Sequence, residues 1–152
     1  MKKDLTTIIS GIVDNLGSEN ISIRDNTYSD NYFNSGFTCP GVFVGFNFFT
    51  EEDRKKLDKF IKAISRKKSL CYTVIKNTGY VAGISIRYNS DMPILNWIES
   101  ARIAAHDSYW EYDHKLRNSG VSDAERNALM KCYHFENVSS FLSEYSKLYK
   151  IA

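Results

Sequence analysis

The chain has 152 residues, of which 43% are hydrophobic and 25% are charged, and its formal net charge is +2. This composition excludes a disordered chain, which would combine low hydrophobicity with high charge, and the length predicts one domain over residues 1–152. A net charge this small does not by itself predict nucleic-acid binding, because nucleic-acid-binding domains carry a concentrated basic surface.

The N-terminal segment is predicted to be an amphipathic helix. Its apolar residues, from Leu5 to Leu16, recur at the i, i+3, i+4 and i+7 spacing of one helical face, and Gly17 stands where a left-handed C-cap belongs. Acidic residues interrupt what would otherwise resemble a signal peptide, so we expect the segment to be part of the fold. A short, weak strand is predicted next, at residues 21–24.

Residues 25–41, DNTYSDNYFNSGFTCPG, show neither strand alternation nor helical spacing. A structureless connection longer than about 12–15 residues is uncommon inside a compact domain, and such loops tend to be functional or disordered. Aromatic rings set among Asn and Ser are typical of recognition loops, so this loop is predicted to bind a partner through Tyr28, Tyr32 and Phe33. The alternative is that the rings fold back onto the protein, or that part of the loop is an unrecognised strand.

The middle of the chain is predicted to supply a sheet and a crossover helix. Residues 41–49 are apolar on both faces, which is typical of a central strand covered on both sides. A helix is expected over residues 51–67, and residues 70–88 are predicted to form two strands of a hairpin with its turn at residues 77–79. If the strand at 41–49 neighboured the strand after the helix, the two would run parallel with a right-handed crossover.

The helix at 51–67 carries a basic stripe opposite its apolar one. The four basic residues of this stripe follow one another at i, i+4, i+7 and i+11: Lys55, Lys59, Lys62 and Arg66. Such a stripe attracts a phosphate backbone, so nucleic-acid binding through these residues is the alternative function. The competing interpretation is a solvated face, because acidic residues at the start of a helix and basic residues at its end also complement the helix dipole.

Helices are predicted to fill the C-terminal third. A proline suited to a first turn begins a long helix over residues 93–117. A capping box at Ser122 and Glu125 predicts a second helix over 122–132, and apolar spacing predicts a third over 141–149. The order of elements predicts an α+β domain in which a small, mostly antiparallel sheet of three to four strands packs with the N-terminal, crossover and long central helices.

The long helix at 93–117 is predicted to present large side chains away from its core face. At 100° per residue, four side chains project opposite the apolar stripe: Ile103, Trp110, Asp113 and Arg117. Trp and Arg are residue types that dominate interface energies, so Trp110 and Arg117 are predicted to bind a partner. The alternative is that the C-terminal helices pack over Trp110 and Ile103 and bury them.

The same helix offers three candidate metal ligands. Asp107, Glu111 and His114, at i, i+4 and i+7, are close enough in projection to share one divalent cation. Because the sequence indicates no further ligand on a second element, a solvated helix flank is favoured, and neither a metal nor a cofactor is expected. A metal-dependent hydrolase is the third functional hypothesis.

No catalytic residue is predicted. The sequence has neither a Gly-x-Ser-x-Gly elbow nor a Gly-x-x-x-x-Gly-Lys phosphate loop, so enzymatic activity is left open but not favoured. Three cysteines without a Cys-x-x-Cys pair suit a reducing cytoplasm, and no apolar run is long enough to cross a membrane. Cys39 would be a nucleophile only beside a histidine. The leading hypothesis is a cytoplasmic, non-catalytic protein that binds a protein partner, such as an inhibitor, an immunity protein or a host-modulating accessory protein of a phage or bacterium.

Overall fold

The computed structural model describes residues 4–17, 20–46, 51–77 and 80–149. The contacts within the chain divide it into two compact units. Unit 1 comprises Met1–Ser29 and Thr38–Pro93, and unit 2 comprises Asp30–Phe37 and Ile94–Ala152. The chain therefore passes from one unit to the other three times. A single domain over residues 1–152 stays a prediction.

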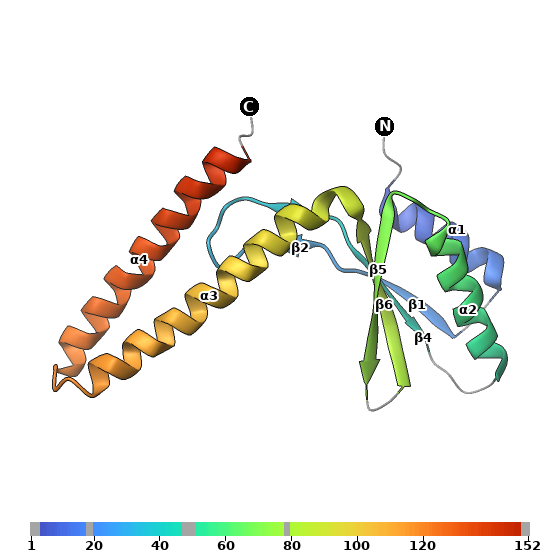
Figure 1. The fold of residues 1–152 in the computed structure, drawn as a ribbon. Coiled ribbons are helices and arrows are strands. Elements are labelled where there is room, and N and C mark those ends of the chain that lie inside the picture. The colour runs from blue at the N-terminus through green and yellow to red at the C-terminus, as the bar shows by residue number, and fades with distance from the viewer. Residues whose placement is uncertain (1–3, 18–19, 47–50, 78–79, 150–152) are drawn as a thin grey trace. The chain divides into compact units, whose positions relative to one another are not determined.

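Unit 1 contains a four-stranded antiparallel sheet in the order β1-β4-β6-β5, with α1 and α2 on one of its faces (Figure 1). The elements of this layer are α1 (Leu5–Leu16), β1 (Ile21–Asp25), β4 (Val42–Phe46), α2 (Glu51–Ser65), β5 (Leu70–Asn77) and β6 (Tyr80–Tyr88). A second, two-stranded sheet pairs β2 (Tyr28–Ser29) with β3 (Thr38–Cys39), and a 3-10 turn, η1 (Asn89–Asp91), follows β6. The α+β class predicted from the sequence is confirmed.

The crossover does not create a parallel pair of neighbouring strands. β6 lies between β4 and β5 and runs antiparallel to both. The reason is the β5–β6 hairpin, which returns β6 beside β4 and sets Val44 opposite Ile84 and Val42 opposite Ile86. All four of these side chains are buried, so the arrangement gives the central pair of strands a continuous apolar face.

The core of unit 1 forms where α1 and α2 cover this face of the sheet. Each helix contributes the stripe that its sequence spacing predicts, and Gly17 closes α1 in the left-handed conformation (φ 61°) as expected. The core side chains include Leu5, Ile9 and Val13 from α1, Phe60 and Ile64 from α2, and Ile84 and Ile86 from β6. The other face of β4 is covered less completely than predicted, since Phe43 is only half-buried; residues 47–49 lie outside the described ranges.

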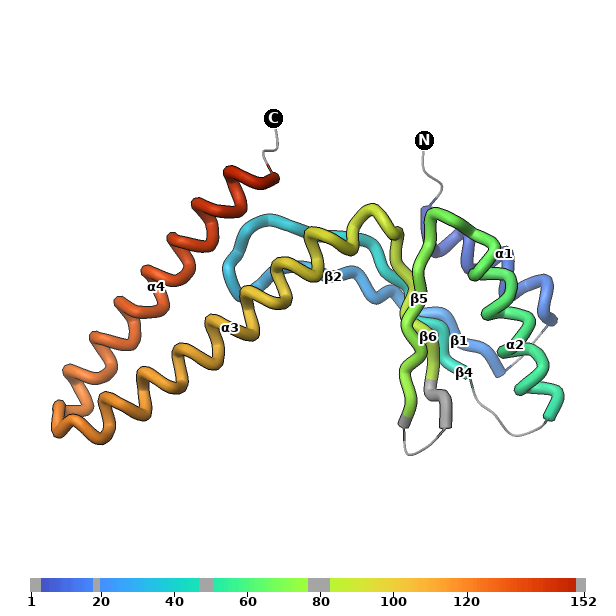
Figure 2. Tube along the Cα trace, in the orientation of Figure 1, coloured from blue at the N-terminus to red at the C-terminus, as the bar shows by residue number. Residues whose placement is uncertain are grey.

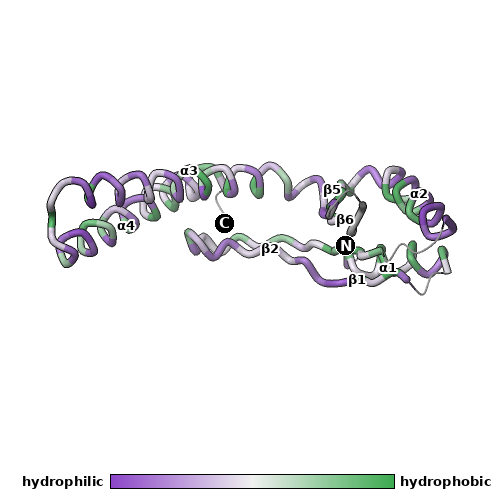
Figure 3. Tube along the Cα trace, turned by 90° about the horizontal axis from the view of Figure 1, so that it is seen from below, coloured by the Kyte–Doolittle hydropathy of each residue, from purple (hydrophilic) through white to green (hydrophobic). Residues whose placement is uncertain are grey.

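Unit 2 is built around a hairpin of two long helices, α3 (Met92–Arg117) and α4 (Asp123–Leu148) (Figure 1). The predicted cap of α4 is confirmed, because the backbone N–H of Glu125 donates to Ser122 Oγ at 3.2 Å. Separate helices over 122–132 and 141–149 are wrong: α4 is continuous. The middle of α4 is held against α3, where Tyr133 packs on Tyr112 with 4.6 Å between ring centroids. Hydrophobic and hydrophilic residues alternate along both helices (Figure 3).

The buried carboxylate of Asp113 connects α3 and α4 near the turn between the two helices. Asp113 is 8% exposed, although its position in the projection predicted an outward face. It accepts a hydrogen bond from Arg117 Nε at 2.8 Å and lies 3.5 Å from Arg126 Nε on α4. Arg126 in turn contacts Asp123 at 3.0 Å. This network links the end of α3 to the start of α4.

Candidate partner-binding site

The loop predicted from the sequence contains an ordered segment, residues 30–37, that belongs to unit 2 (Figure 2). Its two ends are joined by a hydrogen bond from Asp30 N to Phe37 O at 3.0 Å. Asn34 (φ 55°) and Gly36 (φ 86°) take the left-handed backbone that Asn and Gly tolerate best. The crowding of Asn, Ser and Gly, which had no strand or helix period, therefore encodes a compact turn.

Asp30 holds this turn together. Its Oδ1 accepts hydrogen bonds from the backbone N–H groups of Tyr32 (3.2 Å) and Phe33 (3.0 Å), and its Oδ2 accepts one from Ser35 (3.1 Å). The side chain is only 5% exposed, so these three donors replace the water that a buried carboxylate loses. The backbone at Tyr32 is thereby fixed.

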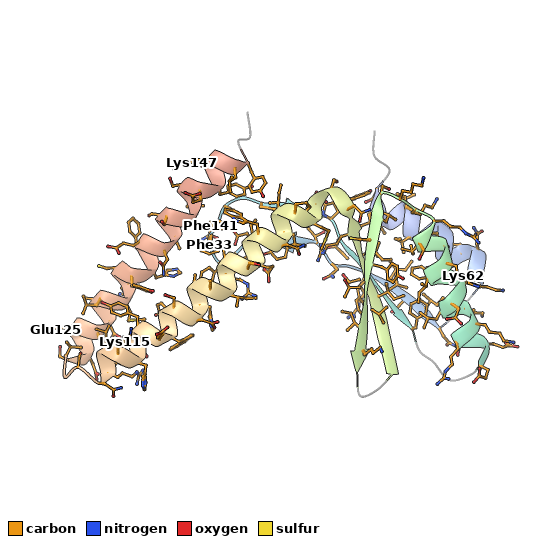
Figure 4. The ribbon with its side chains drawn as sticks, in the orientation of Figure 1. Phe33, Lys62, Lys115, Glu125, Phe141 and Lys147 are labelled. Carbon is orange, nitrogen blue, oxygen red and sulfur yellow. The ribbon has the colours of Figure 1, made fainter. Side chains whose placement is uncertain are left out.

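Phe33 lies in the interior of unit 2, which removes it from the predicted contact surface. It is 1% exposed and stacks on Phe141 of α4 with 3.7 Å between ring centroids and 10° between planes (Figure 4). Phe141 also stacks on Trp97 of α3 at 4.9 Å. The alternative that rings fold back onto the protein holds for Phe33 and Phe37, both buried. For Phe33 the reason is that the aromatic cluster of α3 and α4 offers its ring an apolar site.

Tyr32 points instead toward a pocket between the turn, α3 and α4. Its ring meets the ring of His134 edge-on, with 5.4 Å between centroids. The pocket has a volume of about 270 Å³ and is lined by Tyr32, His106, Tyr109, Trp110, Met130, Lys131 and His134. All seven lining residues belong to unit 2. We call this the Trp110 pocket.

Trp110 is half in solvent at the edge of the pocket, with 53% of its surface exposed. Its indole N–H donates to Nε2 of His106 at 3.0 Å, and its ring meets the ring of Tyr109 edge-on at 5.3 Å. In this hydrogen bond Nε2 of His106 is the acceptor, since an indole nitrogen can only donate. The indole is therefore held in place by partners on its own helix.

The expectation that the C-terminal helices bury Trp110 and Ile103 is wrong. Ile103 is 52% exposed and lies two helical turns from Trp110 on the same face of α3. Phe135 on α4, 71% exposed, stands one helical turn from Lys131 at the pocket. α4 packs on a different side of α3, where Tyr112 and Leu116 lie. The large apolar side chains of Ile103, Trp110 and Phe135 therefore remain outside the core.

The lining of the pocket is mostly aromatic, and one lysine stands among it. Burial raises the pKa of Tyr32 above its ordinary value of 10.0, and the neighbouring Tyr109 raises it further, against an opposing effect of Arg102. Of the described residues that line the pocket, none is acidic. Lys131 forms no ion pair with any residue that the structure describes. One uncompensated ammonium therefore stands beside the aromatic lining.

The structure brings together two of the five predicted partner-binding residues. Tyr32 and Trp110 line the same pocket. Tyr28 is half-buried in β2 of unit 1, opposite Cys39. Arg117 lies at the end of α3, paired with Asp113, and is not among the lining residues.

Most of the remaining lining residues were missed by sequence reasoning. His134 follows Met130 by four positions and Lys131 by three on the same helix, which places all three side chains on one face. This spacing was not recognised, because the helix was expected to end at about residue 132, before His134. Read as one helix from Asp123 to Leu148, the sequence would have placed His134 beside Lys131.

The candidate metal ligands do not gather into a site. Within the described residues, no group of three or more His, Cys, Asp or Glu side chains is placed to hold a metal ion. Glu111 lies 3.8 Å from Lys115, and His114 is 3.2 Å from the amide of Asn118. Glu111 and His114 each contact a residue four positions further along the chain.

Cys39 is not activated as a nucleophile. It is buried in unit 1, and burial raises the pKa of its thiol above the ordinary value of 9.0, partly opposed by Arg87, whose Nη1 lies 3.6 Å from the sulfur. Reactive cysteines have a lowered pKa, because the thiolate is the nucleophile. The environment of Cys39 acts in the other direction.

The predicted basic stripe lies on the outer face of α2. Lys55, Lys59, Lys62 and Arg66 are all exposed, and among the described residues none of them forms an ion pair (Figure 4 labels Lys62). The stripe is in unit 1, whereas the Trp110 pocket is in unit 2. The two candidate surfaces therefore belong to different units.

Comparisons with protein-family models, curated proteins and solved structures give no match. Within the described ranges, no helix is both long enough and apolar enough to cross a lipid bilayer. The residues of the two candidate surfaces must therefore carry the functional assignment.

Proposed function

We propose that the protein is a non-catalytic recognition protein that binds a protein partner through the Trp110 pocket. The observation that supports this most is that Tyr32 and Trp110, 78 positions apart in the sequence, line one pocket. Exposed large apolar side chains gathered around a pocket are typical of interfaces, and Trp and Tyr are the residue types that most often dominate their energies. An inhibitor or an immunity protein acts through a surface of this kind.

The fixed geometry of the lining residues also favours recognition. Tyr32 lies in the turn that Asp30 organises, and Trp110 is hydrogen-bonded to His106. Side chains that are already ordered lose less conformational entropy on binding, which costs about 0.5–1.5 kcal/mol for each side chain that must be immobilised. A rigid aromatic pocket therefore binds a partner more tightly than a mobile one of equal area.

Affinity capture with matched variants tests this proposal. The bait is the full chain, as wild type, as Trp110→Ala and as Ile75→Ala, where Ile75 is an exposed apolar residue of unit 1 (41%). We expect proteins retained by the wild type and by Ile75→Ala to be lost with Trp110→Ala, because truncating an interface tryptophan removes roughly 2 kcal/mol or more. Circular dichroism checks that each bait is folded. Identical sets of captured proteins from all three baits would refute the proposal.

Nucleic-acid binding through α2 is the second candidate, supported by four exposed basic side chains without ion pairs among the described residues. A phosphate-binding stripe predicts affinity that falls steeply with salt. Charge reversal at Lys59 and Lys62 together should abolish a gel shift that the wild type gives at low salt. Treating the capture experiment with nuclease separates this candidate from direct protein binding. Absence of any complex at low salt would exclude it.

A further inference from the structure

The Trp110 pocket joins an aromatic lining to a single positive charge. Tyr32, Tyr109 and Trp110 supply rings, and Met130 supplies an adaptable apolar floor. His106 accepts a hydrogen bond from the indole. Lys131 is the lysine of the lining, and its ammonium has no ion-pair partner within the described chain.

The volume of the pocket matches one aromatic side chain. An apolar cavity of about 150 Å³ is enough to bind benzene. The pocket is open to solvent and has a volume of about 270 Å³, which leaves room for a ring together with the carbon atoms that join it to a backbone. Rings prefer edge-to-face or offset contacts with one another, and Tyr109 and Trp110 already meet at 88°, presenting both an edge and a face.

The charges near the pocket select the residues that flank such a ring. Arg102, whose charge acts on the Tyr32 phenol, is already paired with Glu99 at 2.9 Å. An acidic group on the partner would pair with Lys131 at the rim, where it meets no opposing carboxylate among the lining residues. A basic segment would meet only like charge there.

We infer that the Trp110 pocket binds an aromatic side chain carried on an acidic peptide segment. The ring enters between Tyr32 and Trp110, and a flanking carboxylate pairs with Lys131. This inference rests on the proposed function and specifies the chemistry of the partner. It commits to a peptide, because the pocket holds one ring and its lining offers one cation, whereas a nucleic-acid strand requires a track of both.

Synthetic peptides test the inference directly. The first probe is a blocked pentapeptide with a central phenylalanine and two aspartates on each side. In the matched probes the aspartates become asparagines, the aspartates become lysines, or the phenylalanine becomes alanine. Binding to the full chain is measured by calorimetry and by NMR shifts of the indole N–H signals, up to about 1 mM peptide. We expect the acidic aromatic peptide to bind about tenfold more tightly than the asparagine version, and the other two not to saturate.

Charge reversal on α4 supplies the matched control. Lys131→Glu should remove the preference for aspartate over asparagine. Lys147→Glu changes the net charge equally, at an exposed site of the same helix outside the pocket lining, and should leave the preference intact (Figure 4). Trp110→Phe identifies the NMR signal of the pocket indole, since Trp97 is the other tryptophan.

Several outcomes would overturn the inference. Equal binding of the aspartate and asparagine peptides, an unchanged preference in Lys131→Glu, or no binding of any peptide would each do so. Displacement of the peptide by a short oligothymidylate at lower concentration would replace it with nucleic-acid recognition. If the peptides fail while Trp110→Ala still loses its captured protein, the proposed function stands and the chemistry assigned to the partner is wrong. If Trp110→Ala loses nothing, the proposed function fails as well.

Discussion

Asp30 shows how one side chain can order a segment that has no secondary structure. Its carboxylate receives three backbone N–H groups from Tyr32, Phe33 and Ser35. These bonds fix the chain so that the ring of Phe33 enters the core and the ring of Tyr32 faces the pocket. The turn and the lining of the Trp110 pocket therefore depend on the same carboxylate.

Replacing Asp30 tests this dependence. Asp30→Ala leaves buried N–H groups without their acceptor, so we expect the free energy of unfolding to fall by roughly 1–3 kcal/mol, as measured by urea denaturation. The control is Asp107→Ala, an exposed aspartate of α3, which should change stability by less than about 0.5 kcal/mol. Equal effects of the two substitutions would show that Asp30 does not organise the turn.

Whether a side chain is buried or exposed could be predicted from the sequence only where the residue lies in a regular helix or strand. The exposure of Trp110 follows from its angle on a helix, which period alone fixes. Phe33 and Tyr32 are neighbours in a segment without period, and their opposite fates depend on hydrogen bonds to Asp30. Asp113 was misplaced because its two arginine partners, one of them on α4, offset the cost of burying it, and a projection of one helix cannot show them.

At the scale of elements, Gly83 on β6 leaves space for the ring of Phe43 on the neighbouring strand β4. A Cβ there would lie 2.2 Å from Cζ of Phe43 and 2.6 Å from the carbonyl oxygen of Val44. The ring of Phe43 crosses this position, and Arg24 stacks over it with its Cζ 4.9 Å from the centroid. The absence of a side chain at Gly83 thus allows the ring of Phe43 to lie on the sheet face opposite the helices.

Two glycine substitutions should have opposite effects. Gly83→Ala forces Phe43 and the backbone of β4 apart, and we expect a loss of roughly 1–3 kcal/mol in the free energy of unfolding. Gly11→Ala in α1 meets no atom within 4 Å and should stabilise the protein by about 0.5–1 kcal/mol, because alanine favours the helix. Urea denaturation of both variants checks the pair. A stabilised Gly83→Ala would mean that β4 and β6 are not so closely packed.

The bounds of a helix could be predicted where the sequence marks both of its ends. α3 begins at a proline suited to a first turn and ends before Ser119 and Gly120, and its bounds agree with the sequence to within one residue. α4 has a strong cap at Ser122 but a weak period near its middle, so its length could not be derived locally. The short strands β2 and β3 are only two residues long, too short for any alternation to be visible.

At the scale of the whole molecule, buried tyrosines make the stability sensitive to alkaline pH. Burial raises the pKa of Tyr88 in unit 1 and of Tyr145 in unit 2 above the ordinary value of 10.0. The charge of Asp30 raises the pKa of Tyr145 further. The folded chain therefore holds these protons more tightly than the unfolded chain does.

The sign of the effect follows from linkage. The stabilisation is fully present below pH 10.0 and is lost as the pH rises through the folded-state pKa values. We expect Tyr145→Phe, which keeps the ring, to reduce the fall in the free energy of unfolding between about pH 9 and about pH 11. Tyr72→Phe removes an exposed phenol (39%) and should leave the fall unchanged. Identical pH profiles for wild type and Tyr145→Phe would contradict this account.

The three passages of the chain between the units limit how the Trp110 pocket can be moved to another scaffold. A graft of the helical hairpin alone would carry Trp110 and Lys131 but would omit Tyr32 and the ring of Phe33, which come from a stretch more than 50 positions upstream. A transplant would need both pieces, with residues 30–37 supplied as an insert or as a second chain. Loss of either piece would leave an incomplete pocket.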